Sequence, residues 1–157
     1  MLSPASLAQI DQEVAKYPSN QRQSAVMSAL RIAQVEKGWL AIETMDFVAD
    51  YLGMPAIAVY EVATFYNMYN TVPTGKYKVT LCTNISCMLM GAPEMAEHLK
   101  QRLGCEFGET TADGKFTLKE GECMGACGDA PLFLINNHRM ESFLTAEKID
   151  TILEELK

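Results

Sequence analysis

The hydrophobic pattern of the sequence changes once, at residues 70–75, and this change constrains the fold more than any other feature. Asn70-Thr71-Val72-Pro73-Thr74-Gly75 concentrates residues that break helices and form turns. Before this segment, apolar residues recur at spacings of three and four, which is typical of helices that bury one face. After it, residues 76–82 alternate polar and apolar side chains, which is typical of a strand. We therefore predict two domains, a helical region at residues 1–72 and an α/β domain at residues 73–157.

The first region is predicted to be a bundle of short helices. Gly38 and Gly53 follow two of the periodic segments and are suited to end helices in the left-handed conformation. Pro55 suits the first turn of the next helix. The predicted helices cover residues 6–17, 20–37, 43–52 and 55–66. The aromatic residues of the last segment are expected in the core: Tyr60, Phe65, Tyr66 and Tyr69.

The second region is predicted to alternate strands with helices. Asp113-Gly114 and Asn136-Asn137 are turn signals between strand-like runs, and Thr145 is suited to cap the last helix. The predicted order is β-α-β-β-β-α, so the fold class is α+β, with a helical bundle followed by a small α/β layer. The predicted elements are strands 76–82, 116–122, 132–135 and 139–142 and helices 93–103 and 146–156.

Charge and hydropathy exclude several classes of function. The chain has 13 basic and 20 acidic residues, a net charge of -7, which disfavours binding to nucleic acid phosphates. A helix, a glycine turn and a second helix around Gly53 resemble a helix-turn-helix, but residues 55–66 contain no lysine or arginine. No apolar run is long enough to span a bilayer, and residues 1–4 do not begin a secretory signal. We expect a cytoplasmic protein without direct membrane insertion.

Four of the five cysteines form two close pairs. Cys82 and Cys87 are separated by four residues, and Cys123 and Cys127 by three. Each pair follows a predicted strand, so we expect both pairs in loops where a rigid element directs the thiolates toward a common centre. Cys105 has no partner at ligand spacing and is predicted to be a packing thiol.

Spacing alone leaves more than one chemistry open for this quartet. Structural disulfides fit poorly with an odd number of cysteines and no export signal. A thiol-disulfide enzyme is disfavoured because its reactive pair usually appears as C-x-x-C. A tetrahedral zinc site with four thiolates and a [2Fe-2S] cluster both accept the observed spacings. The zinc alternative would make the chain a metal-stabilised interaction module.

The neighbourhood of the pairs favours the cluster. Six nearby residues supply hydroxyls, amides or bare backbone that could donate hydrogen bonds toward sulfur. Residues 79–99 and 120–138 contain no lysine or arginine, and several acidic residues lie close by in sequence. Because negative charge opposes the addition of an electron, we expect a low reduction potential. The candidate donors are Thr83, Asn84, Ser86, Gly91, Gly125 and Gly128, and the acidic residues are Glu94, Glu97, Glu120, Glu122 and Asp129.

Several segments together resemble a known family. They are residues 82–87 (CTNISC), 91–92 (GA), 108–116 (GETTADGKF) and 122–131 (ECMGACGDAP), together with residues 43–66 in the helical region. They are similar to the E subunit family of NADH:quinone oxidoreductase, respiratory complex I. Met90 lies where relatives often have a basic residue. The resemblance covers nearly the whole chain.

The resemblance implies a thioredoxin-like domain that carries one [2Fe-2S] cluster on Cys82, Cys87, Cys123 and Cys127. It also implies a partner, the flavoprotein subunit that oxidises NADH and holds FMN, among other subunits of a peripheral arm on the cytoplasmic face of the inner membrane. The chain itself contains no G-x-G-x-x-G and no Walker A pattern, so NADH and FMN are expected only through that partner. NAD-reducing hydrogenases and NAD-dependent formate dehydrogenases are alternative hosts. His98 and His138 are not expected to be ligands.

Overall fold

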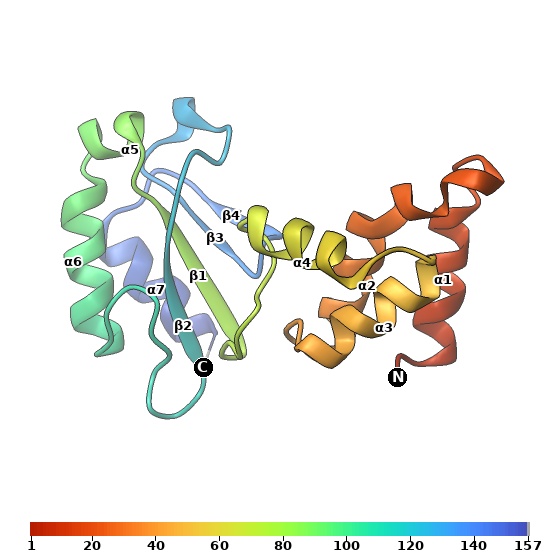
Figure 1. The fold of residues 1–157 in the computed structure, drawn as a ribbon. Coiled ribbons are helices and arrows are strands. Elements are labelled where there is room, and N and C mark those ends of the chain that lie inside the picture. Colours follow the sequence, from red (N-terminus) through yellow and green to blue (C-terminus); the bar gives the residue numbers. More distant parts are fainter. Residues whose placement is uncertain (157) are drawn as a thin grey trace. The chain divides into compact units, whose positions relative to one another are not determined.

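The computed structural model describes residues 1–156 and divides the chain into two compact units (Figure 1). The first unit is Met1–Pro73 and the second begins at Thr74. The division therefore lies inside the segment 70–75, where the sequence pattern changes. Over the part of the chain that is described, no helix combines the length and apolar character needed to cross a bilayer.

The first unit is entirely helical. Ser3 caps the first helix by accepting a hydrogen bond from the Ser6 backbone N–H, and Gly53 ends the helix Ile42–Leu52 with a φ of 68°. The prediction of one helix over residues 20–37 is wrong: a 3-10 segment precedes an α-helix, because residues 19–24 are polar, exposed and have no apolar face to bury. The elements are α1 (Pro4–Val14), η1 (Ser19–Ala25), α2 (Val26–Lys37), α3 (Ile42–Leu52) and α4 (Ala56–Phe65).

The core of this unit is formed by the apolar faces of its helices. Val59 and Ala63, one turn apart on α4, are both buried. Tyr69 is also buried, and its hydroxyl donates a hydrogen bond of 2.8 Å to the Met27 carbonyl. Two of the aromatic residues expected in the core are exposed. Phe65 is 80% exposed because it lies two residues beyond Ala63 and so on the opposite side of the helix, and Tyr66, which follows the helix, is 39% exposed.

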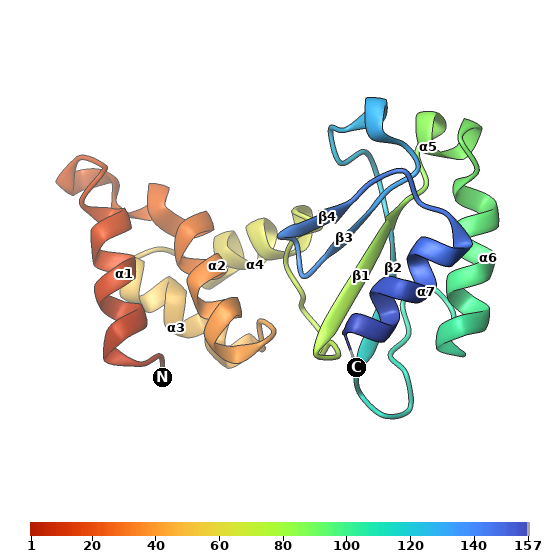
Figure 2. The same cartoon turned by 180° about the vertical axis from the view of Figure 1, so that it is seen from behind.

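The second unit is a four-stranded sheet with helices on one face (Figure 2). The strand order is β2-β1-β3-β4; β1 is parallel to β2 and antiparallel to β3, and β3 is antiparallel to β4. The predicted β-α-β-β-β-α order is confirmed, with one additional short helix, α5 (Ile85–Leu89). The other elements are β1 (Tyr77–Cys82), α6 (Ala92–Leu103), β2 (Phe116–Gly121), η2 (Cys127–Asp129), β3 (Phe133–Ile135), β4 (Arg139–Glu141) and α7 (Ala146–Glu155).

The core of the second unit lies between the sheet and the helices α6 and α7. Val79 and Leu81 of β1 point into this core, as the alternation of the strand requires. Cys105 is 8% exposed within the same core, which confirms the prediction of a packing thiol. The Nε2 atom of His98 on α6 lies 2.8 Å from the Oδ1 atom of Asp150 on α7, so this histidine links the two helices.

Candidate metal centre

Both cysteine loops leave the sheet at the same edge. β1 and β2 are adjacent and parallel, and the last residue of β1, Cys82, is in register with the last residue of β2, Gly121. The Thr83 N–H donates a hydrogen bond of 3.0 Å to the Gly121 carbonyl, which continues the pairing one step beyond the strands. The carboxyl ends of parallel strands are a common position for ligand sites in α/β sheets. The loops that follow Cys82 and Gly121 are far apart in sequence, and both begin at this end of the sheet.

The first cysteine pair is buried. Cys82 is 3% exposed at the end of β1, and Cys87 is 2% exposed. Cys87 lies in the short helix α5 rather than in the expected loop, because Asn84 caps this helix: its Oδ1 accepts a hydrogen bond of 3.0 Å from the Ile85 N–H. Burial, followed by a hydrogen bond with Cys82, raises the pKa of the Cys87 thiol to about 11. In the metal-free protein, this thiol is therefore neutral near pH 7.

The second cysteine pair is exposed. Cys123 follows β2 by two residues, and Cys127 begins the single turn η2. The two Sγ atoms lie 3.8 Å apart. Two thiolates bonded at about 2.3 Å to one tetrahedral metal are separated by about 3.8 Å, so this pair already has the spacing of two ligands on one metal.

Backbone groups act on one sulfur of each pair. The Gly125 N–H donates a hydrogen bond to the Cys123 Sγ at 3.4 Å, and the backbone of Leu132 lowers the pKa of the Cys87 thiol, against the larger effect of burial. Gly125 has a φ of 76°, a conformation that glycine adopts without strain. Such hydrogen bonds favour the thiolate form and are one means of tuning an iron-sulfur centre. The sequence predicted Gly125 as a donor toward sulfur, and the structure confirms it.

Gly121 allows the second loop to pass close to the first strand. A Cβ atom at this position would lie 2.5 Å from the Met124 Cε and 2.6 Å from the Thr80 Cγ2. Met124 thereby packs against the small buried cluster that contains Cys82 and Cys87. Met124 therefore fills space beside the first cysteine pair, as flexible methionine side chains often do in cores.

Two of the predicted donors to sulfur bind carboxylates instead. The Thr83 Oγ1 donates to Glu120 at 3.0 Å, and the Asn84 Nδ2 donates to Glu122 at 2.7 Å. The Asn84 contact joins the two cysteine loops, and the Thr83 contact joins the first loop to the end of β2. The sequence identified the four residues separately but could not pair them, because the pairing depends on the register between β1 and β2.

The thiols are arranged in pairs rather than around a single point. Within residues 1–156, no three cysteine, histidine, aspartate or glutamate side chains converge closely enough to hold one metal ion. A tetrahedral zinc site needs four sulfurs around one ion, whereas a [2Fe-2S] cluster needs two thiolates on each of two irons. The spacing of 3.8 Å between the Cys123 and Cys127 sulfurs suits two ligands on one metal in either case.

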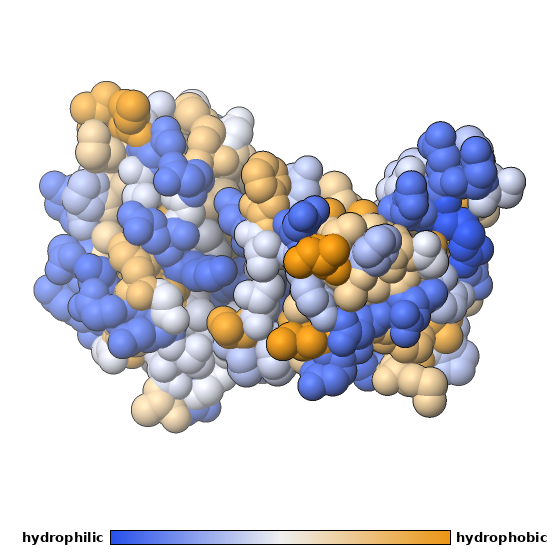
Figure 3. All heavy atoms as spheres, in the orientation of Figure 1, coloured by the Kyte–Doolittle hydropathy of each residue, from blue (hydrophilic) through white to orange (hydrophobic). Residues whose placement is uncertain are grey.

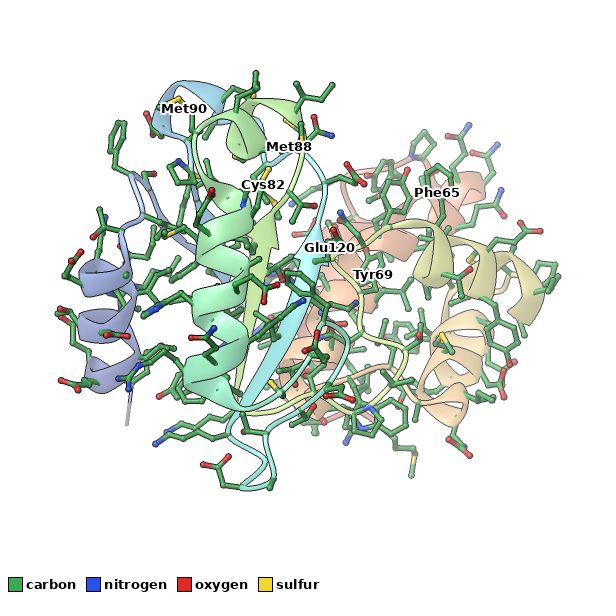
Figure 4. The ribbon with its side chains drawn as sticks, turned by 90° about the vertical axis from the view of Figure 1, so that its left-hand side faces the viewer. Phe65, Tyr69, Cys82, Met88, Met90 and Glu120 are labelled. Atoms are coloured by element: carbon green, nitrogen blue, oxygen red, sulfur yellow. The ribbon has the colours of Figure 1, made fainter. Side chains whose placement is uncertain are left out.

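Apolar side chains surround this end of the sheet. Figure 3 shows hydrophobic residues gathered over α5, and Figure 4 shows Met88 and Met90 at the same end of the unit as Cys82. Four apolar residues here are each between 49% and 76% exposed. Their exposure at a site with two exposed thiols is a feature of binding surfaces. They are Ile85, Met88, Leu89 and Met90.

Comparisons with known proteins match nearly the whole chain. Residues 10–157 match the family described as thioredoxin-like [2Fe-2S] ferredoxin. The E subunit of NADH-quinone oxidoreductase from Rickettsia conorii is 41% identical over 145 residues, which cover 92% of this chain and 86% of that one. An E subunit of the same oxidoreductase from Rhizobium meliloti, the one numbered 2, is 42% identical over 149 residues, covering 95% and 87%.

Two longer proteins contain a region similar to this chain. The mitochondrial NADH dehydrogenase [ubiquinone] flavoprotein 2 of Dictyostelium discoideum is 41% identical over 153 residues, which cover 97% of this chain and 62% of that protein. A crystal structure of an NAD+-reducing [NiFe]-hydrogenase in the air-oxidized state has a TM-score of 0.73 at 23% identity. That match covers 89% of this chain but only 24% of the hydrogenase chain, and it supports the fold alone.

Proposed function

Because this chain belongs to the thioredoxin-like [2Fe-2S] ferredoxin family, we propose that Cys82, Cys87, Cys123 and Cys127 hold one [2Fe-2S] cluster. When bound, the cluster supplies one-electron chemistry, which no amino acid side chain of the chain offers at a comparable potential. The chain itself binds the irons, donates hydrogen bonds to sulfur and limits the access of water. It makes and breaks no bond in a substrate.

The observation that carries this proposal is the arrangement of the four thiols at one edge of the sheet. Cys82 and Cys87 contact each other in the interior, and Cys123 and Cys127 lie 3.8 Å apart on the neighbouring loop. This arrangement provides two thiolates for each of two irons. The Gly125 N–H already donates a hydrogen bond to the Cys123 sulfur.

The relatives at about 41% identity extend the proposal to a host complex. They are named as the E subunit of NADH-quinone oxidoreductase. The chain is then an electron-carrier subunit of that oxidoreductase, on a peripheral arm at the cytoplasmic face of the inner membrane. Its cluster exchanges electrons with FMN on a flavoprotein subunit that oxidises NADH. The exposed apolar residues over α5 agree with a protein partner at the cluster end.

Purification of the protein under anaerobic conditions tests the cluster. We expect two irons and two labile sulfides per chain, absorption in the visible range, and a paramagnetic signal after reduction by dithionite. A colourless protein with one zinc per chain would overturn the cluster and favour the interaction module instead.

Affinity purification of the native protein tests the host. We expect an FMN-containing subunit to copurify, and we expect NADH to reduce the cluster only when that subunit is present. Copurification with hydrogenase subunits would be consistent with the proposed cluster but would assign the chain to a different host complex. Reduction of the isolated chain by NADH would contradict the need for a flavoprotein.

The charges near the cysteines set an expectation for the reduction potential. Glu120 and Glu122 are exposed and precede Cys123, within a segment that lacks basic residues. Negative charge beside the cluster opposes its reduction, so we expect a midpoint potential well below zero. A redox titration followed by paramagnetic resonance measures this potential, and a clearly positive value would contradict the expectation.

A further inference from the structure

We propose that Asn84 is a positioning residue, which holds the two cysteine loops together through its hydrogen bond to Glu122. This inference rests on the proposed function, because it concerns the same four thiols. The Asn84 Nδ2 donates to the Glu122 Oε2 at 2.7 Å, and the two residues are 38 positions apart in sequence. Asn84 lies between Cys82 and Cys87, and Glu122 directly precedes Cys123. One hydrogen bond therefore spans the two halves of the ligand set.

Both polar groups of the Asn84 side-chain amide form hydrogen bonds. Its Oδ1 accepts a hydrogen bond of 3.0 Å from the Ile85 N–H and so caps α5, the helix that carries Cys87. Its Nδ2 is thereby directed at Glu122 on the other loop. An asparagine side chain provides one acceptor and one donor group in fixed geometry, which a serine or an aspartate does not. The orientation of α5 and the position of the second loop are thus coupled through one side chain.

The second loop needs such a contact because most of it lies outside the core. Met124 and Ala126 pack against the small buried cluster, whereas Glu122, Cys123, Gly125 and residues 127–129 are exposed. A hydrogen bond to a carboxylate is stronger than one between neutral groups. The Thr83 Oγ1 adds a second contact to Glu120 at 3.0 Å, closer to the strands. Together these bonds keep the exposed loop beside the buried pair.

The chain allows a test in which donor and acceptor are exchanged. Asn84→Asp keeps the oxygen that caps α5 but replaces the donor with a carboxylate that repels Glu122. Combining Asn84→Asp with Glu122→Gln restores a donor opposite an acceptor, now in the reverse direction. The double variant also carries the same net charge as the wild type. The double variant therefore restores the net charge and the donor–acceptor pair together.

The cluster-loaded full chain is challenged with a ferrous-iron chelator, and the loss of visible absorption is followed. We expect Asn84→Asp to lose the cluster about ten-fold faster than the wild type, which corresponds to the loss of one hydrogen bond to a charged group. We expect the double variant to return to within about three-fold of the wild-type rate. The paramagnetic signal of the reduced cluster should shift in Asn84→Asp and return in the double variant.

Glu94→Gln is the matched control. It removes one exposed carboxylate near the first pair in sequence, and we expect it to leave the rate of cluster loss unchanged. Circular dichroism establishes that each variant is folded before the challenge. Equal rates for Asn84→Asp and the wild type, or a double variant as labile as Asn84→Asp, would overturn the inference while the cluster itself stands. A wild-type chain that binds no iron would overturn the proposed function and the inference with it.

Discussion

The two cysteine pairs differ in what holds them in place. Cys82 and Cys87 are buried, and regular structure positions both: one ends the central strand β1 and the other lies in the helix α5. Cys123 and Cys127 are exposed, and a loop with a glycine of positive φ positions them. The first pair is therefore fixed by packing, whereas the second depends on hydrogen bonds and backbone conformation.

This difference suggests a division of roles within the site. The buried pair is shielded from water and from reagents, so it can anchor one iron firmly. The exposed pair is open to solvent, so the iron it would bind is the one that a partner or a reagent reaches first. Substitution and chemical modification can test this contrast between an anchored pair and an accessible pair.

The largest effect is expected from removing single thiols. We expect Cys87→Ala to reduce the iron content by about ten-fold or more, because three thiolates leave one iron open in a buried position. Cys123→Ala should retain more iron, because water can occupy the open position at an exposed iron. Iron and sulfide analysis with visible spectra measures both.

Cys105→Ala is the control for the loss of a thiol. Cys105 is buried in the core between the sheet and the helices, so its loss is expected to cost about 1 kcal/mol of stability without changing the spectrum. Equal iron losses in Cys87→Ala and Cys123→Ala would remove the proposed contrast between the pairs. A colourless Cys105→Ala variant would contradict the ligand assignment.

The second prediction concerns the reactivity of the thiols in the reduced, metal-free chain. Cys87 is buried and its pKa is raised to about 11, so little thiolate is present at neutral pH. We expect iodoacetamide to modify Cys123 and Cys127 on the order of a hundred-fold faster than Cys87 at about pH 8. Mass spectrometry of peptides after timed alkylation measures each rate. Similar rates at all four thiols would show that the first pair is not shielded in solution.

The smallest effect is expected at the glycine that shapes the exposed loop. Gly125→Ala forces alanine into a φ of 76°, which costs about 1 kcal/mol, although its Cβ would meet no atom within 4 Å. The strain should also weaken the hydrogen bond to the Cys123 sulfur and so lower the reduction potential. Thermal unfolding and a redox titration measure the two effects.

Gly128→Ala is the matched control for this substitution. Its Cβ would likewise meet no atom within 4 Å, and its φ is not in the left-handed region. We expect its stability and potential to be close to those of the wild type. If both variants lowered the potential equally, the effect would belong to added bulk in the loop rather than to Gly125.

Much of the fold follows from periodicity in the sequence. The α+β class and the order along the chain of the strands and of the two helices that cover the sheet are confirmed, because each of these elements has a clear apolar face or alternation. The resemblance to the E subunit family is confirmed by relatives at about 41% identity. Both errors in the helix assignments fall where periodicity is absent. Residues 19–25 form a 3-10 segment, and residues 85–89 are a helix too short to show a repeat.

The site could be predicted only in part. Cys82, Cys87, Cys123 and Cys127 were found from their spacing, and their role as ligands stays a prediction. The network that joins them was not predicted. Asn84 and Thr83 donate to carboxylates rather than to sulfur, because the register of β1 against β2 brings Glu120 and Glu122 within reach. Local sequence carries no signal for a register between strands so far apart.

The sequence by itself determined which residues are the candidate ligands and where most of the helices and strands lie, because both depend on spacing along the chain. Tertiary structure alone decided which thiols are buried and which side chains bridge the two loops. These features depend on distances between segments about 38 residues apart. Only the packing of the sheet, with β1 and β2 parallel and in register, fixes those distances.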